Sequence, residues 1–566
     1  MKKFLKRLFA GVVYAVLGLL LVSCAAPQPS PTSTSSPSSS PVESTPSATS
    51  FKPEDYMISL EEDWPTYSDP AVGTDFSDMI AVTNVNDALV FLTNDNTIKP
   101  WLAEKWEMSP DGKVWTIYLR KGVKFHNGET LKASDVVFSL KRHHAIGEGL
   151  SFLFINIEDA KAIDDYTVQF TLKEPFGPFL QTLVRFYVLS EKEVMSHIKT
   201  PGPYGEYGDY AKEWLLTHDA GCGPYKIKEA KMEEYILMEK FDDWWGGWDP
   251  NAPVYFKMFS QPDASTIRTL IANRQLEITD EWQAVETYNA LEQIPGVKIA
   301  RYTVGHNMTL KLHCSKPPTD DVHFRRALAY CLDYNALVDS KTGVAPGSIP
   351  SVNPVPRNVP GFDPNLKQYT FDLEKAKEEL AQSKYADNPG AYPVTYYFAQ
   401  EVPWTEKIAL MLQANAAKIG IKIEVTRMPF GSMIAATQSP DTTPNIFSEI
   451  NAPYFPEAGS QIQSGFHSSC QGTVNNTHWS GDIWDKKIED ALSTLDEKER
   501  FAKYSKLMQE LNDYCGTIYV FDQVELRAVQ TGYFYWPGVD LDSVACCAGY
   551  PLYAHDMRIY PEKKLK

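Results

Sequence analysis

The pattern of apolar and polar positions is clearest over Trp101–Arg142, where it predicts two strands followed by a helix. Apolar and polar side chains alternate along 114–120, the period of a half-buried strand. A Ser-Pro-Asp-Gly sequence at 109–112 precedes this strand and is typical of a tight turn. From Ala133 on, apolar residues recur at helical spacing, and Ser134 is the expected cap of this helix.

Similar patterns farther along the chain predict a mixed α/β protein. Alternation at 166–172 predicts a strand. A helix is expected to begin after Asp372, because aspartate is a good N-cap. A helix from 405 to 419, a terminating Gly420 and an alternating strand then follow one another, which is the order of an α/β unit.

The N-terminus has a basic head followed by an apolar run from Leu8 to Val22 and then by Ser23-Cys24. This layout is that of a secretory signal, and a cysteine after a small residue resembles the bacterial lipobox. We expect residues 1–23 to be a lipoprotein signal peptide and Cys24 to carry the lipid. The alternative is an uncleaved anchor, although the apolar run is short for a membrane-spanning helix. Both alternatives place the rest of the chain outside the cytoplasm.

Residues 25–50 consist almost wholly of Ser, Thr, Pro and Ala. Such a segment has no apolar surface to bury that would offset the entropy of ordering it. We therefore expect 24–52 to hold the lipidated cysteine and a disordered tether. A lipid, a tether and a globular body suit a receptor on the outer face of the cytoplasmic membrane or in the periplasm, but an anchored enzyme would have the same layout.

Length, charge and cysteine content narrow the class of protein further. A chain of 566 residues is too long for one core and indicates two or three lobes. The net charge of −18 argues against nucleic acid as a partner. Seven cysteines follow Cys24 without any C-x-x-C pair, so the sequence indicates no metal site and no cofactor. An exported chain can hold one or two disulfides, and we expect Cys546 and Cys547 to pair elsewhere rather than with each other.

The run AEKWEMSPDGKVWTIYLRKGVKFHNG at 103–128, followed by ASDVVFSLKR at 133–142, resembles the family 5 extracellular solute-binding proteins. These are the large receptors of peptide, nickel and some oligosaccharide ABC importers. The segments GCGPYKI at 221–227, FDDWWGG at 241–247 and FRRALAYCLD at 324–333 continue the resemblance. One departure is Lys132, where the family usually has a hydroxyl residue.

The resemblance implies an α/β, two-lobed periplasmic-binding-protein-like fold of type II, with an extra inserted subdomain and a hinge between the lobes. Ligand would be enclosed by hinge closure. The expected boundaries are 53–86, 221–300 and 520–566 for lobe 1, 87–220 for the inserted subdomain, and 301–519 for lobe 2.

The resemblance also places four loops at the ligand. Their candidate binding residues are Trp282, Gln283, Trp404, Phe430, Glu449, Asn451, Tyr454 and Glu457. In peptide-binding relatives the last loop usually carries an Asp-Tyr pair, whose carboxylate receives the α-ammonium group of the peptide. Here the tyrosine matches Tyr454, but Pro453 stands in place of the aspartate. Burying an ammonium group without a carboxylate is costly, so either Glu449 or Glu457 substitutes, or the ligand is not a peptide.

We therefore expect a monomeric, lipid-anchored receptor that binds oligopeptides and delivers them to the transmembrane subunits of an ABC permease. Oligosaccharides are the second possibility, because aromatic rings beside neutral polar groups suit sugars, and nickel chelates are the third. We expect no enzyme: the chain has no G-x-S-x-G or H-E-x-x-H motif, and the S-x-x-K match at 196–199 lacks its S-D-N partner. A lipid-anchored glycosidase stays open, because it needs only two carboxylates.

Overall fold

The computed structural model describes residues 51–261, 263–351, 353–402, 404–471, 476–479 and 482–564. The expected signal peptide, Cys24 and the tether as far as residue 50 lie outside the described residues. No helix among the described residues is long and apolar enough to cross a membrane.

A four-stranded sheet is formed by segments that lie far apart in the sequence. β1 (Met57–Glu61) pairs in parallel with β10 (Tyr255–Phe259). β9 (Tyr235–Lys240) then joins β10, and β8 (Tyr225–Lys231) joins β9, both antiparallel. The first strand of the described chain is thus held by strands that come nearly two hundred residues later, as the resemblance to a two-lobed protein with an insertion requires.

The segment between β1 and β8 contains an antiparallel sheet of its own. Its strands are β4 (Ala103–Met108), β5 (Val114–Leu119), β7 (Thr167–Leu172) and β6 (Ile157–Asp164), in that spatial order. Helix α2 (Ala133–Ile146) packs against β6 and β7. The predicted strands and helix of this region are confirmed.

The cap of α2 differs from the prediction. Lys132 occupies the N-cap position, and its backbone N–H donates to the Asp135 carboxylate over 2.9 Å. Ser134 lies inside the first turn, so the prediction that it caps the helix is wrong. An acidic side chain at the third helical position can reach back to the N-cap N–H and also stabilises the positive end of the helix.

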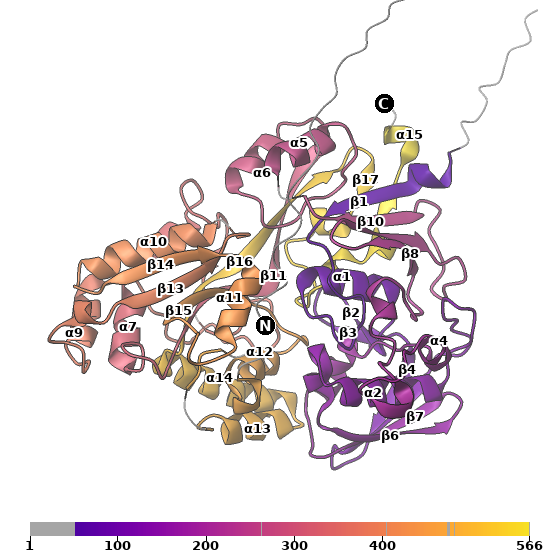
Figure 1. Ribbon diagram of the computed structural model, residues 1–566, viewed down its shortest axis with the longest axis horizontal. Coiled ribbons are helices and arrows are strands. Elements are labelled where there is room, and N and C mark those ends of the chain that lie inside the picture. Colours follow the sequence, from indigo (N-terminus) through magenta and orange to yellow (C-terminus); the bar gives the residue numbers. More distant parts are fainter. Residues whose placement is uncertain are drawn as a thin grey trace, which may run out of the picture. The chain divides into compact units, whose positions relative to one another are not determined.

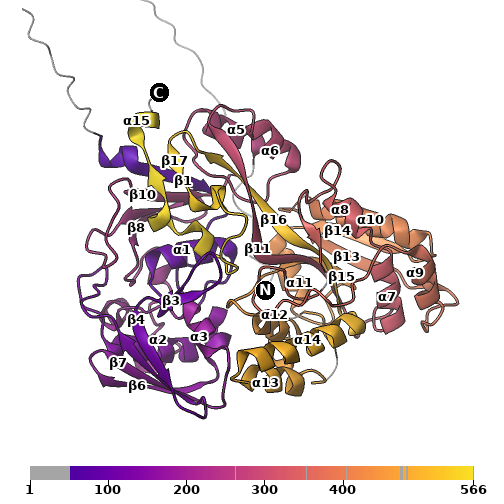
Figure 2. The same ribbon diagram turned by 180° about the vertical axis from the view of Figure 1, so that it is seen from behind.

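A six-stranded sheet has the spatial order β12-β16-β11-β15-β13-β14. Its two longest strands, β11 and β16, pair antiparallel along most of their length. Figures 1 and 2 show these strands running from the region of β1 and β10 into the sheet of β13 and β14. The strand bounds are β11 (Val297–Leu312), β12 (Ile349–Pro350), β13 (Val394–Ala399), β14 (Ile423–Met428), β15 (Ile446–Asn451) and β16 (Thr517–Gln530).

The predicted features of this second region are confirmed. The Asp372 side chain accepts hydrogen bonds from the N–H groups of Glu374 and Lys375 and caps α9 (Leu373–Leu380). Helix α10 (Trp404–Ala417) is followed by Gly420 at φ +86°, a left-handed conformation that favours glycine, and then by β14.

Shorter strands and the other helices complete the fold. The strands are β2 (Val90–Leu92), β3 (Ile98–Pro100), β17 (Phe534–Tyr535) and β18 (Arg558–Ile559). The helices are α1 (Phe76–Val85), α3 (Phe179–Thr182), α4 (Glu191–Ser196), α5 (Ala264–Ala272), α6 (Val285–Leu291), α7 (Val322–Tyr330), α8 (Tyr334–Val338), α11 (Phe430–Thr437), α12 (Ala458–Phe466), α13 (Asp485–Ser493), α14 (Glu497–Tyr514) and α15 (Pro561–Lys564).

One apolar core joins the inserted sheet to helices of the second region. It contains Trp115 and Phe170 from the inserted sheet together with Ile462 of α12 and Leu492 of α13. The backbone N–H of Gly177 also donates to the Leu492 carbonyl over 2.7 Å. These contacts hold the two regions together on one side of the long strands β11 and β16.

Candidate ligand-binding site

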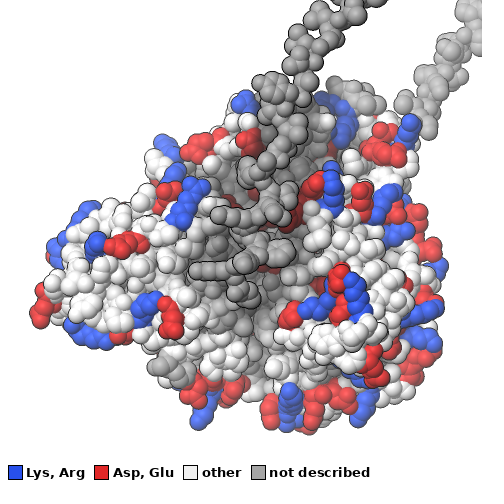
Figure 3. Space-filling view, viewed as in Figure 1, with Lys and Arg blue, Asp and Glu red and all other residues white. Residues whose placement is uncertain are grey.

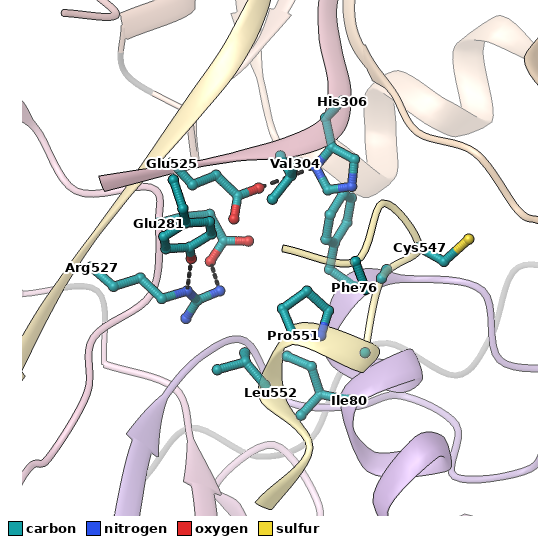
Figure 4. Close-up of a pocket in the computed structure, with 14 residues that line it drawn as sticks. Phe76, Ile80, Glu281, Val304, His306, Glu525, Arg527, Cys547, Pro551 and Leu552 are labelled. Atoms are coloured by element: carbon teal, nitrogen blue, oxygen red, sulfur yellow. Dashed lines mark hydrogen bonds and ion pairs between the residues drawn. The ribbon is translucent and has the colours of Figure 1, made fainter. Parts of the chain in front are cut away.

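A small cavity lies beside the two long strands, where α1 and the C-terminal loop approach them. His306 of β11 and Glu525 and Arg527 of β16 point toward it, as do Glu281 and Phe76 (Figure 4). The cavity therefore combines charged groups from the long strands with an aromatic wall from α1, a combination typical of small-molecule sites.

Arg527 is the centre of the charges at this cavity. Its guanidinium forms ion pairs with Glu281 and, over 3.1 Å, with Glu62, and it donates to the Tyr302 hydroxyl over 2.9 Å and to the Thr279 carbonyl over 2.8 Å. All of these side chains are buried. The Arg527 guanidinium thus links β16 to β11 and to the segment 279–281. Its removal would leave buried carboxylates without a partner.

The carboxylates around Arg527 exceed the positive charge available to them. Burial raises the pKa of Glu62 to about 7, although Arg527 opposes the shift, and burial raises the pKa of Asp280 to about 6. Burial also raises the pKa of Glu61 and of Glu281 well above the ordinary range. Glu62, Asp280 and Glu281 all interact with the one Arg527 guanidinium, and Glu61 accepts from the Asp280 N–H over 3.1 Å. This group, the Arg527 cluster, therefore binds protons more readily than exposed carboxylates do.

Aromatic contacts connect the cavity to Trp282. The Phe76 ring meets the His306 ring edge-on with centroids 4.8 Å apart and meets the Trp282 ring at 5.8 Å. On its other side, His306 Nδ1 lies 3.1 Å from a Glu525 oxygen. The predicted Trp282 therefore stands beside the cavity, one ring away from its charged wall.

A second small cavity brings together two predicted residues that are far apart in the sequence. Gln283 and Trp404 both line it, together with Glu281, which also lines the first cavity. Gln283 donates to Asp280 over 2.9 Å, and the Trp404 ring lies 5.8 Å from the Phe521 ring. Three of the eight predicted residues thus lie at or beside adjoining cavities.

Glu449 and Asn451 lie on β15 opposite β11. The Glu449 carboxylate is 3.5 Å from the Lys311 ammonium, and its side chain keeps 23% of its exposure. Burial raises its pKa, although Lys311 opposes the shift. Asn451 donates to the Asn307 side chain and to the Pro354 carbonyl, each over 3.1 Å. Asn451 is therefore engaged by the protein, whereas Glu449 pairs with Lys311 among the described residues and stays partly exposed.

Tyr454 lies where the second region meets the inserted sheet. Its ring packs edge-on against Phe152 at 5.2 Å, and its carbonyl accepts a hydrogen bond of 2.9 Å from Arg185. Burial raises the pKa of its hydroxyl, and the charge of Glu449 adds to the shift. The charge of Glu449, on β15, is thus felt at the hydroxyl of Tyr454, which lies in the loop that follows.

The two remaining predicted residues have other surroundings. Glu457 is 1% exposed, and its carboxylate forms a double ion pair with Arg500 at 2.8 Å and accepts the Tyr504 hydroxyl at 2.8 Å. Phe430 is 42% exposed, and its backbone N–H donates to Glu401. Both carboxylate oxygens of Glu457 are taken by the protein, and neither Glu457 nor Phe430 lines the two cavities.

The sequence reasoning missed His306, Glu525 and Arg527. The signal that could have found them is the occurrence of charged residues within 297–312 and 517–530, two long runs that are otherwise strongly apolar. A charge within a buried strand needs a partner and frequently marks a functional site.

Other site chemistries receive no support from the part of the chain that the structure describes. It contains no group of three or more His, Cys, Asp or Glu side chains arranged to hold a metal ion. On the face drawn in Figure 3, the described basic side chains are interspersed with acidic ones and form no continuous basic surface.

Comparison with known proteins identifies the family to which this chain belongs. Residues 97–472 match the model for bacterial extracellular solute-binding proteins, family 5 Middle, and the chain belongs to this family. It is 26% identical over 479 residues to a probable D,D-dipeptide-binding periplasmic protein of Escherichia coli K12, covering 83% of this chain and 89% of the relative. The nickel-binding periplasmic protein of the same organism is 26% identical over 462 residues, covering 77% and 83%.

Solved structures confirm the predicted fold class. A periplasmic binding protein DppA of Helicobacter pylori, solved in complex with the peptide STSA, superposes with a TM-score of 0.76 at 22% identity, covering 89% of this chain and 98% of that one. The fold is therefore that of the type II periplasmic binding proteins. Together, the family and the fold define an extracytoplasmic solute-binding protein of an ABC importer.

Proposed function

We propose that this protein is a lipid-anchored receptor for short peptides and that Glu449 receives the α-ammonium group of the ligand. The observation that carries the proposal is the difference between the two candidate carboxylates. Glu457 is sealed in its ion pair with Arg500, whereas Glu449 is partly exposed and, within the described ranges, pairs with Lys311 at 3.5 Å. A carboxylate with free acceptor capacity can bind an ammonium group without breaking a buried pair.

The position of Glu449 also supports this role. The family resemblance implies that peptide-binding relatives carry an aspartate beside the tyrosine of this loop. In this chain Pro453 stands in place of that aspartate. The charge of Glu449 contributes to the raised pKa of the Tyr454 hydroxyl. Glu449, on strand β15, would thus replace the missing aspartate of the loop and restore a carboxylate–tyrosine pair with Tyr454.

The aromatic and amide groups form the other half of the proposed site. Trp404 and Gln283 line the second cavity, and Trp282 stands beside the first, behind Phe76. Aromatic rings there would cover apolar parts of the peptide, and the amide would bind its backbone. The charged groups at the first cavity are tied to Arg527 or to His306, so the proposed role is binding and not catalysis.

A screen of the melting temperature tests the ligand class. Separate pools of di- to pentapeptides, oligosaccharides and nickel–histidine chelates are added to the purified protein. A ligand at about a hundred times its Kd stabilises the folded state by about 2.7 kcal/mol, which is readily seen as a shift. We expect a shift with peptides; a shift with oligosaccharides or the chelate alone would contradict the peptide proposal and leave the receptor class intact.

The lipid anchor has its own test. We expect the exported wild-type protein to partition with membranes and its mature N-terminal peptide to carry diacylglycerol and acyl groups at Cys24. The C24A variant should lose that mass and that partitioning. An unmodified N-terminus on the mature wild-type protein would contradict lipidation without affecting the ligand proposal.

A further inference from the structure

Two adjacent cysteines lie in the loop at 545–549, behind the wall of the first cavity. The Sγ atoms of Cys546 and Cys547 are 4.0 Å apart, and both residues are 0% exposed. The two residues belong to a bend outside helices and strands, so no ladder hydrogen bond opposes a small rotation of their backbone. Cys546 and Cys547 both carry free thiols in this structure.

The loop is held in place from two sides. The N–H groups of Ala545 and Cys546 donate to the side-chain oxygens of Asn94 and Asn96 over 3.2 and 2.7 Å, which fixes the loop to the turn between β2 and β3. Arg185 donates to the Ala548 carbonyl over 2.9 Å. These bonds keep both thiols next to each other and next to a guanidinium.

The two thiols are chemically unequal. Burial by itself would raise the pKa of Cys547, but the Cys546 thiol and the Arg185 guanidinium outweigh burial and lower it. Burial raises the pKa of Cys546, and its contact with Cys547 adds to the shift. Because the thiolate is the reactive form, Cys547 is the expected nucleophile and Cys546 the thiol that closes the ring.

We propose that Cys546 and Cys547 form a vicinal disulfide in the exported protein. This revises our expectation that each pairs elsewhere. The Cys547 thiolate attacks a disulfide of the extracytoplasmic thiol–disulfide system, which forms a mixed disulfide and releases one thiolate. Cys546 then loses its proton and attacks Cys547 Sγ, which releases the second thiolate. Two electrons pass from the cysteines to the oxidant, which leaves as a dithiol. Because both thiols are buried in the closed loop, this exchange needs a transient opening of the loop that exposes the sulfur atoms.

The bond would be easier to reduce than an ordinary structural disulfide. Neighbouring Cα atoms are about 3.8 Å apart, below the usual separation of about 4.4–6.8 Å in disulfides, so the small ring is strained. Strained disulfides are the more reducible ones. The pair therefore works as a reversible element and not as a permanent cross-link.

The location couples the pair to the binding site. Cys547, Ala548 and Gly549 line the first cavity, and Figure 4 shows the Cys547 sulfur directed away from it. Ring closure would thus move the wall without placing sulfur against the ligand. Arg185, which binds the Ala548 carbonyl, also binds the Tyr454 carbonyl, so a shift of the loop reaches the tyrosine of the proposed peptide site. The inference needs export of the chain, but it does not depend on the identity of the ligand.

Peptide mapping tests the bond directly. The full-length exported protein is denatured in N-ethylmaleimide and digested with trypsin without reduction. Cleavage after Arg527 and Arg558 gives one peptide, 528–558, whose only cysteines are Cys546 and Cys547. We expect this peptide to be unlabelled and lighter than the dithiol by two hydrogen atoms, and to take up two labels after reduction. Two labels before reduction, or a cross-link to another peptide, would overturn the proposal.

Cys331 is the matched control. It is also 0% exposed, and it is the only cysteine of its tryptic peptide, 327–341. It should be labelled before reduction. A second readout is the melting temperature: mild reductant should shift it in the wild type but leave it unchanged in C546S/C547S. An equal response of both proteins would contradict a coupling between the bond and the fold, even if the bond is found.

Discussion

The buried charges around Arg500 and those around Arg527 have opposite balances. Arg500 faces one carboxylate, Glu457, whose two oxygens it binds at 2.8 Å. Arg527 faces Glu62 and Glu281 directly and has further buried carboxylates nearby. Both groups are equally hidden from water, so the number of acidic partners is the main difference between them.

Because of that difference, the Arg500–Glu457 pair is structural, whereas the Arg527 cluster responds to pH. A balanced pair is fully satisfied, and removal of either member leaves an uncompensated buried charge. An unbalanced cluster relieves itself by binding protons, which links its energy to pH. The balanced pair ties α12 to α14, whereas the Arg527 cluster lies where β16 passes the first cavity. The responsive group is therefore the one beside the proposed ligand.

The largest expected effect is the loss of the balanced pair. R500M should lower the free energy of unfolding by about 3–5 kcal/mol, because Glu457 would remain buried without its cation. Chemical denaturation measures this. The control E457L/R500M removes both charges and should recover most of the loss. A single variant as stable as the wild type would show that Glu457 is reached by water and would reopen its role as a ligand group.

A smaller effect, on the pH dependence of stability, is expected in the Arg527 cluster. The raised pKa of Glu62, about 7 against an ordinary 4.5, means that the folded state holds a proton that the unfolded state has released. Stability should therefore fall as pH rises between these values, by roughly 3 kcal/mol from this group. Denaturation curves from pH 4.5 to 8 measure the slope.

The E62Q variant sharpens the comparison. Glutamine cannot ionise, so this variant should be more stable than the wild type at pH 8 and should show a flatter pH profile, while Arg527 keeps Glu281. E457Q is the matched change in the balanced pair and should destabilise at pH 8. If E62Q destabilised the protein as much as E457Q does, this would contradict the view that carboxylates are in excess around Arg527.

The smallest expected effect lies at the aromatic walls. W282A and W404A should each weaken binding of a peptide found in the screen by about tenfold, equivalent to about 1.4 kcal/mol, with little change in melting temperature. Y392A serves as the control, because Tyr392 is an exposed aromatic that lines neither cavity. Unchanged affinity in both tryptophan variants would contradict the placement of the peptide at these cavities.

Local patterns were enough to predict the elements at 103–142 and the capped helix after Asp372, because hydrogen bonds and periodicity within a short segment determine them. The Arg527 cluster could not be predicted in this way. It gathers residues 61–62, 280–281 and 525–527, and only tertiary folding brings such distant segments together. The adjoining positions of Gln283 and Trp404 were expected from the family resemblance and not from any pattern around them. The seclusion of Glu457 likewise depends on Arg500, forty-three residues later.

Calorimetric titration of a free-amine peptide and its N-acetylated form into wild type and E449Q tests the central proposal most directly. The account predicts that acetylation weakens binding to the wild type by at least about tenfold, because a charge-assisted hydrogen bond is lost. E449Q should bind the free-amine peptide as weakly as the wild type binds the acetylated one and should barely distinguish the two peptides. Equal affinity of the wild type for both peptides, or undiminished discrimination by E449Q, would contradict the role of Glu449.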